Sequence, residues 1–392
     1  MDKETEVNPI LSDAEEEIKP LITAKLTYEC GGVQHEKLNA RLFNDVLELT
    51  GFSFSRSLKL NTISAVEAAN YQVLVRHKKG DITLSMLGHL YEDFVRHFVR
   101  TYNEIVFNES LMSEKSHFEA AGQYVSPAGD MAPAVFRICE TALVILPQTH
   151  ALVRIPFCLM AKVKNEPYRF TITDKVGRSY VLQKLGFSTD HFLREFKARE
   201  AELMKQTKEK LGGIAAVSDE LAKLMMEGLV VSVESIRAVS APFADALEAK
   251  LNEQIPQEYA YLKAVSGTLA VGIKRGLMGS LTGESIILLA PSGGKTIMES
   301  LGESASATYV FDMGDMEWRA FLPAFNESML AVNFRREPIY MSDETLASDK
   351  HEAYRNAIMR CPSLRTLRSQ FLGRVSHSGF DTWKRSLDAY IK

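Results

Sequence analysis

Apolar positions follow the same pattern in three separate stretches of the chain. Each stretch begins with alternating apolar residues, typical of a strand, and continues with apolar residues three or four apart, typical of a helix. The pattern is clearest in residues 82–102, returns in residues 180–196 and is fainter in residues 308–329. This repetition predicts one folding module used three times, with each helix closing a small β-sheet. The aromatic residues expected to cap the sheets are Tyr91, Phe94, Phe98, Phe192, Phe196, Trp318, Phe321 and Phe325.

Residues 20–113 are predicted to form the first module. Period-two apolar runs recur through this region and are separated by turn signals such as Gly31-Gly32. They predict about seven short antiparallel strands, followed by the first amphipathic helix. Because Phe and Tyr each bury roughly 150–250 Å², the aromatic stripe is expected to be the main contact that holds the module together.

Composition divides the rest of the chain. Residues 114–133 are predicted to be a linker, because Ser126, Pro127 and Gly129 fall close together within it. A second module of strands and one helix is expected over residues 134–212. The third part is expected to be an α+β module over 213–392, with a helical insert over 213–258 and a basic helical tail over 345–392.

Seven short strands closed by one C-terminal amphipathic helix resemble the pleckstrin-homology-like (PH-like) superfold. The likeness rests on this order of elements and on the motif Gly88-x-x-Tyr91-x-x-Phe94-x-x-x-Phe98 with its echoes. It implies an α+β fold of repeated small antiparallel β-sandwich or barrel modules in tandem, each capped by a C-terminal amphipathic helix, plus a helical C-terminal extension. The resemblance covers residues 21–112 best, 134–211 well and 260–332 loosely.

The resemblance implies a binding function without choosing the ligand. Members of the superfold bind phosphoinositides, peptides or other proteins. Lipid-binding members need a basic cluster in the loop that joins the first two strands, whereas residues 31–37 here are close to neutral, which argues against an inositol lipid at the first module. Short phrases at residues 272–277 and 333–340 also resemble uncharacterised bacterial proteins, which implies no activity.

Length and charge narrow the classes of function. At 392 residues the chain is too long for one ordinary core, and 46% hydrophobic with 24% charged residues is typical of a soluble globular protein. The net charge of −4 gives no basic field for nucleic acid. No apolar run is long enough to span a bilayer, and the acidic, flexible leader over residues 1–19 is unlike a signal peptide. We therefore expect a cytoplasmic location and no nucleic-acid partner.

The cysteines and histidines indicate neither a metal site nor a catalytic centre. The sequence contains no C-x-x-C pair, no Cys/His spacing typical of zinc sites and no G-x-S-x-G elbow. We expect free thiols, no metal, no cofactor and no catalytic residues. The four cysteines are Cys30, Cys139, Cys158 and Cys361.

A Gly-rich segment in the third module is the best candidate for an anion site. Residues 292–296 follow an apolar run, but Leu289 stands where a phosphate loop requires glycine. A hairpin turn is the favoured interpretation. The alternative is an anion bound by backbone N–H groups near Lys274, Arg275 and Lys295.

Arginines near the C-terminus are further candidates. Arg335 and Arg336 are consistent either with a bidentate site for a partner or with an internal ion pair. Residues 350–392 hold nine Lys or Arg against three acids. This basic tail is consistent with a solvated face, with an acidic partner or with weak peripheral contact to a membrane.

These observations favour a non-enzymatic interaction or scaffold protein whose modules bind a protein or peptide partner. The alternative is a small-molecule or anion-binding protein, or an enzyme, with its site in the Gly-rich third module. The sequence identifies no partner or oligomeric state, and it does not decide whether the third module is a true repeat.

Overall fold

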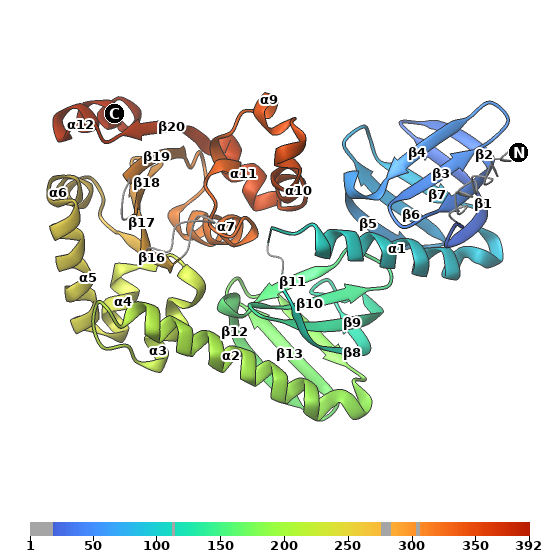
Figure 1. Ribbon diagram of the computed structural model, residues 1–392, viewed down its shortest axis with the longest axis horizontal. Helices are drawn as coiled ribbons and strands as arrows, with labels where there is room; N and C mark the ends of the chain where they lie inside the picture. Colours follow the sequence, from blue (N-terminus) through green and yellow to red (C-terminus); the bar gives the residue numbers. More distant parts are fainter. Residues whose placement is uncertain (1–18, 112–113, 276–283, 303–305) are drawn as a thin grey trace, which may run out of the picture.

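The computed structural model describes residues 19–111, 114–275, 284–302 and 306–392. These residues form a mixed α+β fold with three antiparallel sheets of seven, seven and six strands. In Figure 1 the first sheet lies at the blue end, the second in green, and the third among the yellow and red helices. Within the described residues, no helix is long and apolar enough to cross a membrane.

The first sheet has the strand order β4-β3-β2-β1-β7-β6-β5. Buried and exposed side chains alternate along much of β2, β3 and β4, because one face of the sheet packs on the core and the other faces solvent. Helix α1 follows β7 after one 3₁₀ turn. The bounds are β1 Ile22–Cys30, β2 Val33–Leu42, β3 Val46–Thr50, β4 Ser55–Lys59, β5 Ile63–Ala69, β6 Gln72–His77, β7 Ile82–Ser85 and α1 Tyr91–Asn108.

The second sheet repeats this order as β11-β10-β9-β8-β14-β13-β12 and is followed by α2. The expected linker over residues 114–133 is wrong, because β8 occupies much of it and Ser126–Asp130 is a hydrogen-bonded hairpin turn. Ala120 and Tyr124 point into the core from β8. The bounds are β8 Ser116–Val125, β9 Met131–Cys139, β10 Ala142–Pro147, β11 Val153–Pro156, β12 Met160–Glu166, β13 Arg169–Asp174, β14 Ser179–Gln183 and α2 Thr189–Leu211.

The backbone repeats at the junction between the last strand and the helix. Met86 and Gly88 have φ of 59° and 58°, and Lys184 and Gly186 have φ of 58° and 58°. These left-handed conformations turn the chain from β7 into α1 and from β14 into α2. Glycine adopts them without steric cost, which explains why a Leu-Gly pair stands at both junctions.

Each of these two helices has two parts with different contacts. The N-terminal half of α1 buries Phe94 and Phe98 in the first core, and the N-terminal half of α2 buries Phe192 and Phe196 in the second. The C-terminal halves continue past their own sheets. That of α1 lies against β10, and that of α2 reaches α3 (Asp219–Leu224), so each helix links its unit to the next (Figure 1).

The third sheet has a different topology, the sequential order β15-β16-β17-β18-β19-β20. The expectation of a third copy of the same module is therefore not met. Its central strands β18 and β19 are buried on both faces. One face is covered by α6 (Pro256–Val265) and α12 (Phe380–Ile391), and the other by α7 (Trp318–Ala331), α8 (Glu337–Tyr340) and α11 (Pro362–Gln370). Strand bounds are β15 Val231–Ser232, β16 Ala270–Arg275, β17 Glu284–Ser292, β18 Lys295–Leu301, β19 Ser306–Asp312 and β20 Phe371–Ser376.

The C-terminal tail over residues 345–392, predicted to be helical, also contains β20, which pairs with β19 and completes the third sheet. The third aromatic stripe lies on α7, where Phe321 and Phe325 contact Phe311 of β19 while Trp318 is partly buried. Helix bounds are α4 Val233–Val239, α5 Ala241–Gln254, α6 Pro256–Val265, α7 Trp318–Ala331, α8 Glu337–Tyr340, α9 Asp343–Leu346, α10 Glu352–Arg360, α11 Pro362–Gln370 and α12 Phe380–Ile391.

The hydrophobic cores do not follow a three-module division. The first sheet and the N-terminal part of α1 enclose a core of their own. The second sheet, α2 and the third unit share one continuous core. The described residues thus form one separate body and one larger body made of two units.

Candidate functional site at the junction of the units

The outer edge of the first sheet is closed by a segment of the second unit. Strand β5 lies at the sheet edge. The Ala68 N–H donates to the Thr149 carbonyl over 2.6 Å, and the Ala151 N–H donates to the Val66 carbonyl over 3.1 Å. Residues 149–151 therefore act as a short added strand and satisfy polar groups that an open edge would leave unpaired.

A buried asparagine on α1 holds the same loop. The Asn103 side chain, 1% exposed, donates to the carbonyls of Pro147 and His150 over 3.1 Å each and accepts from the Leu152 N–H over 2.8 Å. The three hydrogen bonds that Asn103 makes thus fix the backbone of residues 147–152 on both sides of the added strand.

An arginine of the second sheet completes this contact. Arg137 on β9 donates two hydrogen bonds to the Glu104 carboxylate of α1, over 2.7 and 2.8 Å. Its guanidinium lies 5.0 Å from the ring centre of Phe107. The hydrogen bonds to Glu104 raise the pKa of Arg137, so the guanidinium stays protonated.

The equivalent edge of the second sheet is open. Strand β12 occupies the position of β5, and among the described residues no strand pairs with its outer side. Every residue from 161 to 166 is exposed, including Lys162 and Lys164. Glu166 pairs with Arg169 to close the β12–β13 hairpin, so the backbone groups of Asn165 and Val163 point away from β13.

The hairpin next to each edge ends in an exposed tyrosine. Tyr71 is 76% exposed in the β5–β6 turn, and Tyr168 is 90% exposed in the β12–β13 turn. Both have left-handed backbones, with φ of 59° and 62°. The two edges thus share their hairpin geometry and their exposed aromatic tip, and they differ in whether a strand has been added.

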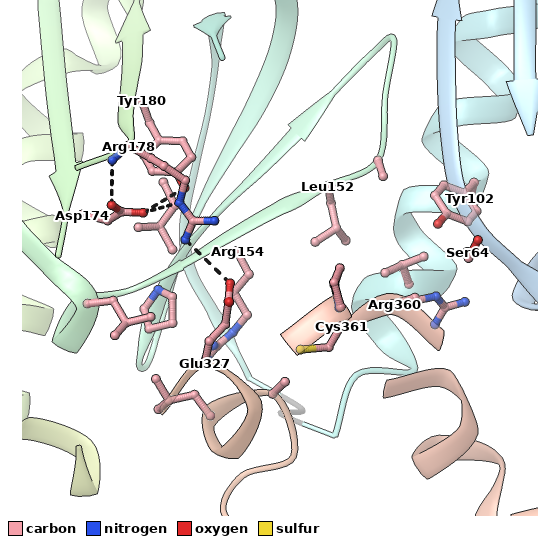
Figure 2. A pocket seen from close by; sticks show the side chains of 18 residues that line it. Ser64, Tyr102, Leu152, Arg154, Asp174, Arg178, Tyr180, Glu327, Arg360 and Cys361 are labelled. Carbon is pink, nitrogen blue, oxygen red and sulfur yellow. Dashed lines mark hydrogen bonds and ion pairs between the residues drawn. The ribbon is translucent and has the colours of Figure 1, made fainter. Parts of the chain in front are cut away.

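A cavity of about 290 Å³ lies where the three units meet (Figure 2). Three arginines line it, and each has an acidic partner, in the pairs Arg154–Glu114, Arg178–Asp174, Arg178–Glu327 and Arg360–Glu109. Because these carboxylates neutralise the guanidinium groups, the cavity carries no strong excess of positive charge.

The cavity offers little for acid–base or nucleophilic chemistry. Asp174 accepts hydrogen bonds from the Val176 and Arg178 backbone, the Arg178 guanidinium and the Tyr180 hydroxyl, over 2.7 to 3.2 Å. Burial raises the pKa of Tyr180 to about 12 and also raises the pKa of the Cys361 thiol. Both side chains are therefore protonated at neutral pH, and a protonated thiol is a poor nucleophile. These residues join the units.

The predicted anion site is not assembled as expected. Lys274 on β16 lies 3.6 Å from the Glu227 carboxylate in a buried ion pair and 5.3 Å from the ring centre of Phe334. The side chain of Arg275 and residues 276–283 lie outside the described part of the chain. Lys295 stands at the β17–β18 turn, which is the predicted hairpin.

The arginine pair also has internal contacts. Arg336 donates to the Ser300 hydroxyl over 2.9 Å and lies 5.7 Å from the ring centre of Tyr309, while Arg335 is close to Tyr354. Ser300 is five residues from Lys295 along β18, roughly 17 Å at 3.3 Å per residue. Lys295 and Arg336 therefore do not meet at one ligand.

Among the described residues, no group of three or more His, Cys, Asp or Glu side chains could hold a metal ion. The four cysteines are free. Sequence reasoning missed the residues at the open edge. The alternating Lys162-Val163-Lys164 was a usable signal, because lysines at alternate positions are typical of a solvent-exposed edge strand.

No family model and no curated protein matches the chain. Solved structures that match include the C-terminal domain of an unknown protein from Leishmania infantum. That match has 13% sequence identity and a TM-score of 0.21, and it covers 25% of this chain and 97% of that chain. A likeness at this score supports no statement about fold or function.

Proposed function

We propose that the protein is a non-enzymatic binding protein built around two PH-like units, and that the open β12 edge binds an extended segment of a protein partner. One observation carries the proposal. The equivalent edge, β5, already binds an extended segment, residues 149–151 of the same chain. Added strands are a recurring mode of peptide recognition, in which backbone hydrogen bonds supply affinity and side chains supply specificity.

The PH-like assignment is supported by the repeated element order. Both sheets have seven antiparallel strands in the same spatial order, and each is followed by one amphipathic helix that buries two phenylalanines in its sheet. Fold alone does not choose a ligand. The choice of an extended segment therefore rests on the edges.

Charge defines the partner segment. Lys162 and Lys164 lie two residues apart on β12, so their side chains share one face of the sheet. Within the described residues, neither has an ion-pair partner. A segment with acidic side chains at alternate positions would place a carboxylate beside each lysine.

Two fluorescein-labelled hexapeptides test this proposal, Thr-Glu-Val-Glu-Val-Thr and the same peptide with lysine in place of glutamate. We expect fluorescence anisotropy with the full chain to show at least tenfold tighter binding of the acidic peptide. The K162E/K164E double variant should reverse this preference, because the repulsive and attractive charges exchange places.

A matched pair of variants tests the backbone contact. N165P removes the outward N–H and places a ring against an added strand, whereas N165A keeps the N–H. We expect the N165P variant to bind the acidic peptide at least tenfold more weakly than the natural chain does. The N165A variant should bind it with an affinity within twofold of that of the natural chain. Equal binding of both peptides, or a proline variant that binds like the alanine variant, would contradict the proposal.

A further inference from the structure

A second, larger cavity lies between residues of the second sheet and residues of the third unit. It has a volume of about 520 Å³, within the range of roughly 300–1,000 Å³ typical of small-molecule sites. The β13–β14 turn contributes Lys175, Val176 and Arg178 to its lining, and α7 contributes residues between Arg319 and Glu327. Its apolar lining includes Leu159, Leu229 and Leu322. None of the residues predicted from the sequence to bind an anion lines this cavity.

Two cations from different units line this cavity. Lys175 belongs to the β13–β14 turn and Arg319 to α7. Among the described residues, neither side chain has a carboxylate partner. Both are therefore available to an anion that enters the cavity.

The acidic residues of the same cavity are already engaged. Asp174 is saturated by its four hydrogen bonds. One oxygen of Glu327 lies 3.7 Å from Arg178, and the other accepts a hydrogen bond from Ser363. Both carboxylates thus contact Arg178, and the three cations of the lining exceed its two carboxylates by one charge.

The surroundings of Lys175 also favour a bound anion. Although part of its side chain reaches solvent, burial of the ammonium group among protein atoms lowers the pKa of Lys175, and the nearby Lys223 adds to this effect. An anion beside the ammonium would oppose both causes, because an opposite charge stabilises the protonated form.

We propose that this cavity binds a small molecule with an apolar body and one anionic group, which Lys175 and Arg319 recognise together. The apolar body lies against Leu159, Leu229 and Leu322. The anionic group is a carboxylate or a phosphate ester, since either carries the charge and acceptor oxygens that these cations bind. This site is separate from the β12 edge and does not depend on the function proposed for that edge.

Isothermal titration of the full chain with decanoate, decyl phosphate and decanol, each below its micelle-forming concentration, tests the site. We expect at least one of the two anions to bind tenfold or more tighter than decanol. The ratio between decanoate and decyl phosphate then identifies the natural anionic group as carboxylate or phosphate.

Three variants locate the binding. The K175Q/R319Q variant should bind the preferred anion at least tenfold more weakly and should bind decanol with unchanged affinity, because it loses the two positive charges and keeps the apolar lining. A320F, on an exposed position of the α7 wall, should weaken all three ligands by obstructing the cavity. The control K162Q/K164Q, at the β12 edge, should bind like the natural chain.

Circular dichroism should show that every variant keeps the fold. The proposal is overturned if no ligand binds, if decanol binds as tightly as both anions, or if K175Q/R319Q binds the anions unchanged. If only the K162Q/K164Q control lost binding of the anion, the anion would bind at the β12 edge. That result would also overturn the proposal.

Discussion

The first and second sheets share a strand order and differ in almost every contact they make with the rest of the chain. The first encloses its own core, and its edge strand β5 is covered by residues 149–151. The second merges its core with the third unit, and its edge strand β12 is exposed. The same topology therefore supports a self-contained unit in one place and half of a larger body in another.

The two helices explain part of this difference. After burying Phe94 and Phe98, α1 meets the second unit mainly through polar groups, Asn103 and Glu104, and a small apolar cluster around Phe107. In contrast, α2 continues into the third unit with buried Leu203 and Leu211. A mainly polar contact leaves two cores separate, whereas buried leucines on the second half of α2 join them. The sequence that follows the cap, more than the cap itself, decides whether a unit is independent.

The largest expected effect separates the two cores. Phe94→Ala removes a fully buried ring that stacks on Phe98 at 5.7 Å between ring centres, and it should lower the free energy of unfolding of the first core by about 3–5 kcal/mol. Phe192→Ala should cost a similar amount but act on the merged core, because Phe192 packs against Phe136 and Phe170 there.

Urea denaturation followed by hydrogen exchange and mass spectrometry distinguishes these outcomes, since it reports each region separately. With Phe94→Ala, peptides from residues 22–99 should lose protection first, while peptides from the third sheet keep theirs. With Phe192→Ala, the second and third sheets should lose protection together. If Phe94→Ala destabilised all three sheets equally, the separation of the cores would be refuted.

The second prediction concerns the closed edge. Asn103→Ala leaves two carbonyls and one N–H of the 147–152 loop without their partner, and it should cost roughly 1–3 kcal/mol. Exchange at Ala68 and Ala151 should accelerate as the added strand loosens. The control is Glu104→Gln, which weakens a partly exposed ion pair and should cost at most about 1 kcal/mol. Equal effects from the two variants would show that Asn103 does not hold the strand.

Much of the first two units could be predicted from the sequence because their signals are local. Alternating apolar residues indicate strands with one buried face, and the Phe stripes mark helices that pack on them. The missed strand β8 has a weak local signal, since Ala120, Ala121 and Gly122 interrupt its apolar alternation. Which side chains of β8 face the core becomes clear only from its pairing with β9 and β14.

The third unit and the sites were less predictable because they depend on contacts between distant segments. Strand β20 is defined by its pairing with β19, from which five α-helices separate it in the sequence. Its own six residues carry no strong strand signal. Lys274 looked available, but its partner Glu227 comes from a remote turn with a left-handed backbone. Likewise, the cavity between Lys175 and Arg319 exists only where two units meet.

The smallest expected effect tests the merged core through pH. His377 lies 2.8 Å from the fully buried Glu299 carboxylate and 3.9 Å from Glu258. The hydrogen bond to Glu299, opposed in part by burial, raises the pKa of His377 above its ordinary 6.5. Because the folded pKa exceeds the unfolded one, the stabilisation is fully present below pH 6.5 and is lost as pH rises through the folded pKa.

His377→Gln should therefore lower the stability of the merged core by roughly 1 kcal/mol at about pH 6, the net contribution of one such hydrogen bond, and by less at about pH 8.5. Thermal unfolding at the two pH values measures the difference between variant and natural chain. The first core should show no dependence on this substitution at either pH, since His377, Glu299 and Glu258 all belong to the third unit. A penalty that grows with pH would reverse the sign of the linkage, and it would mean that His377 is held neutral beside Glu299.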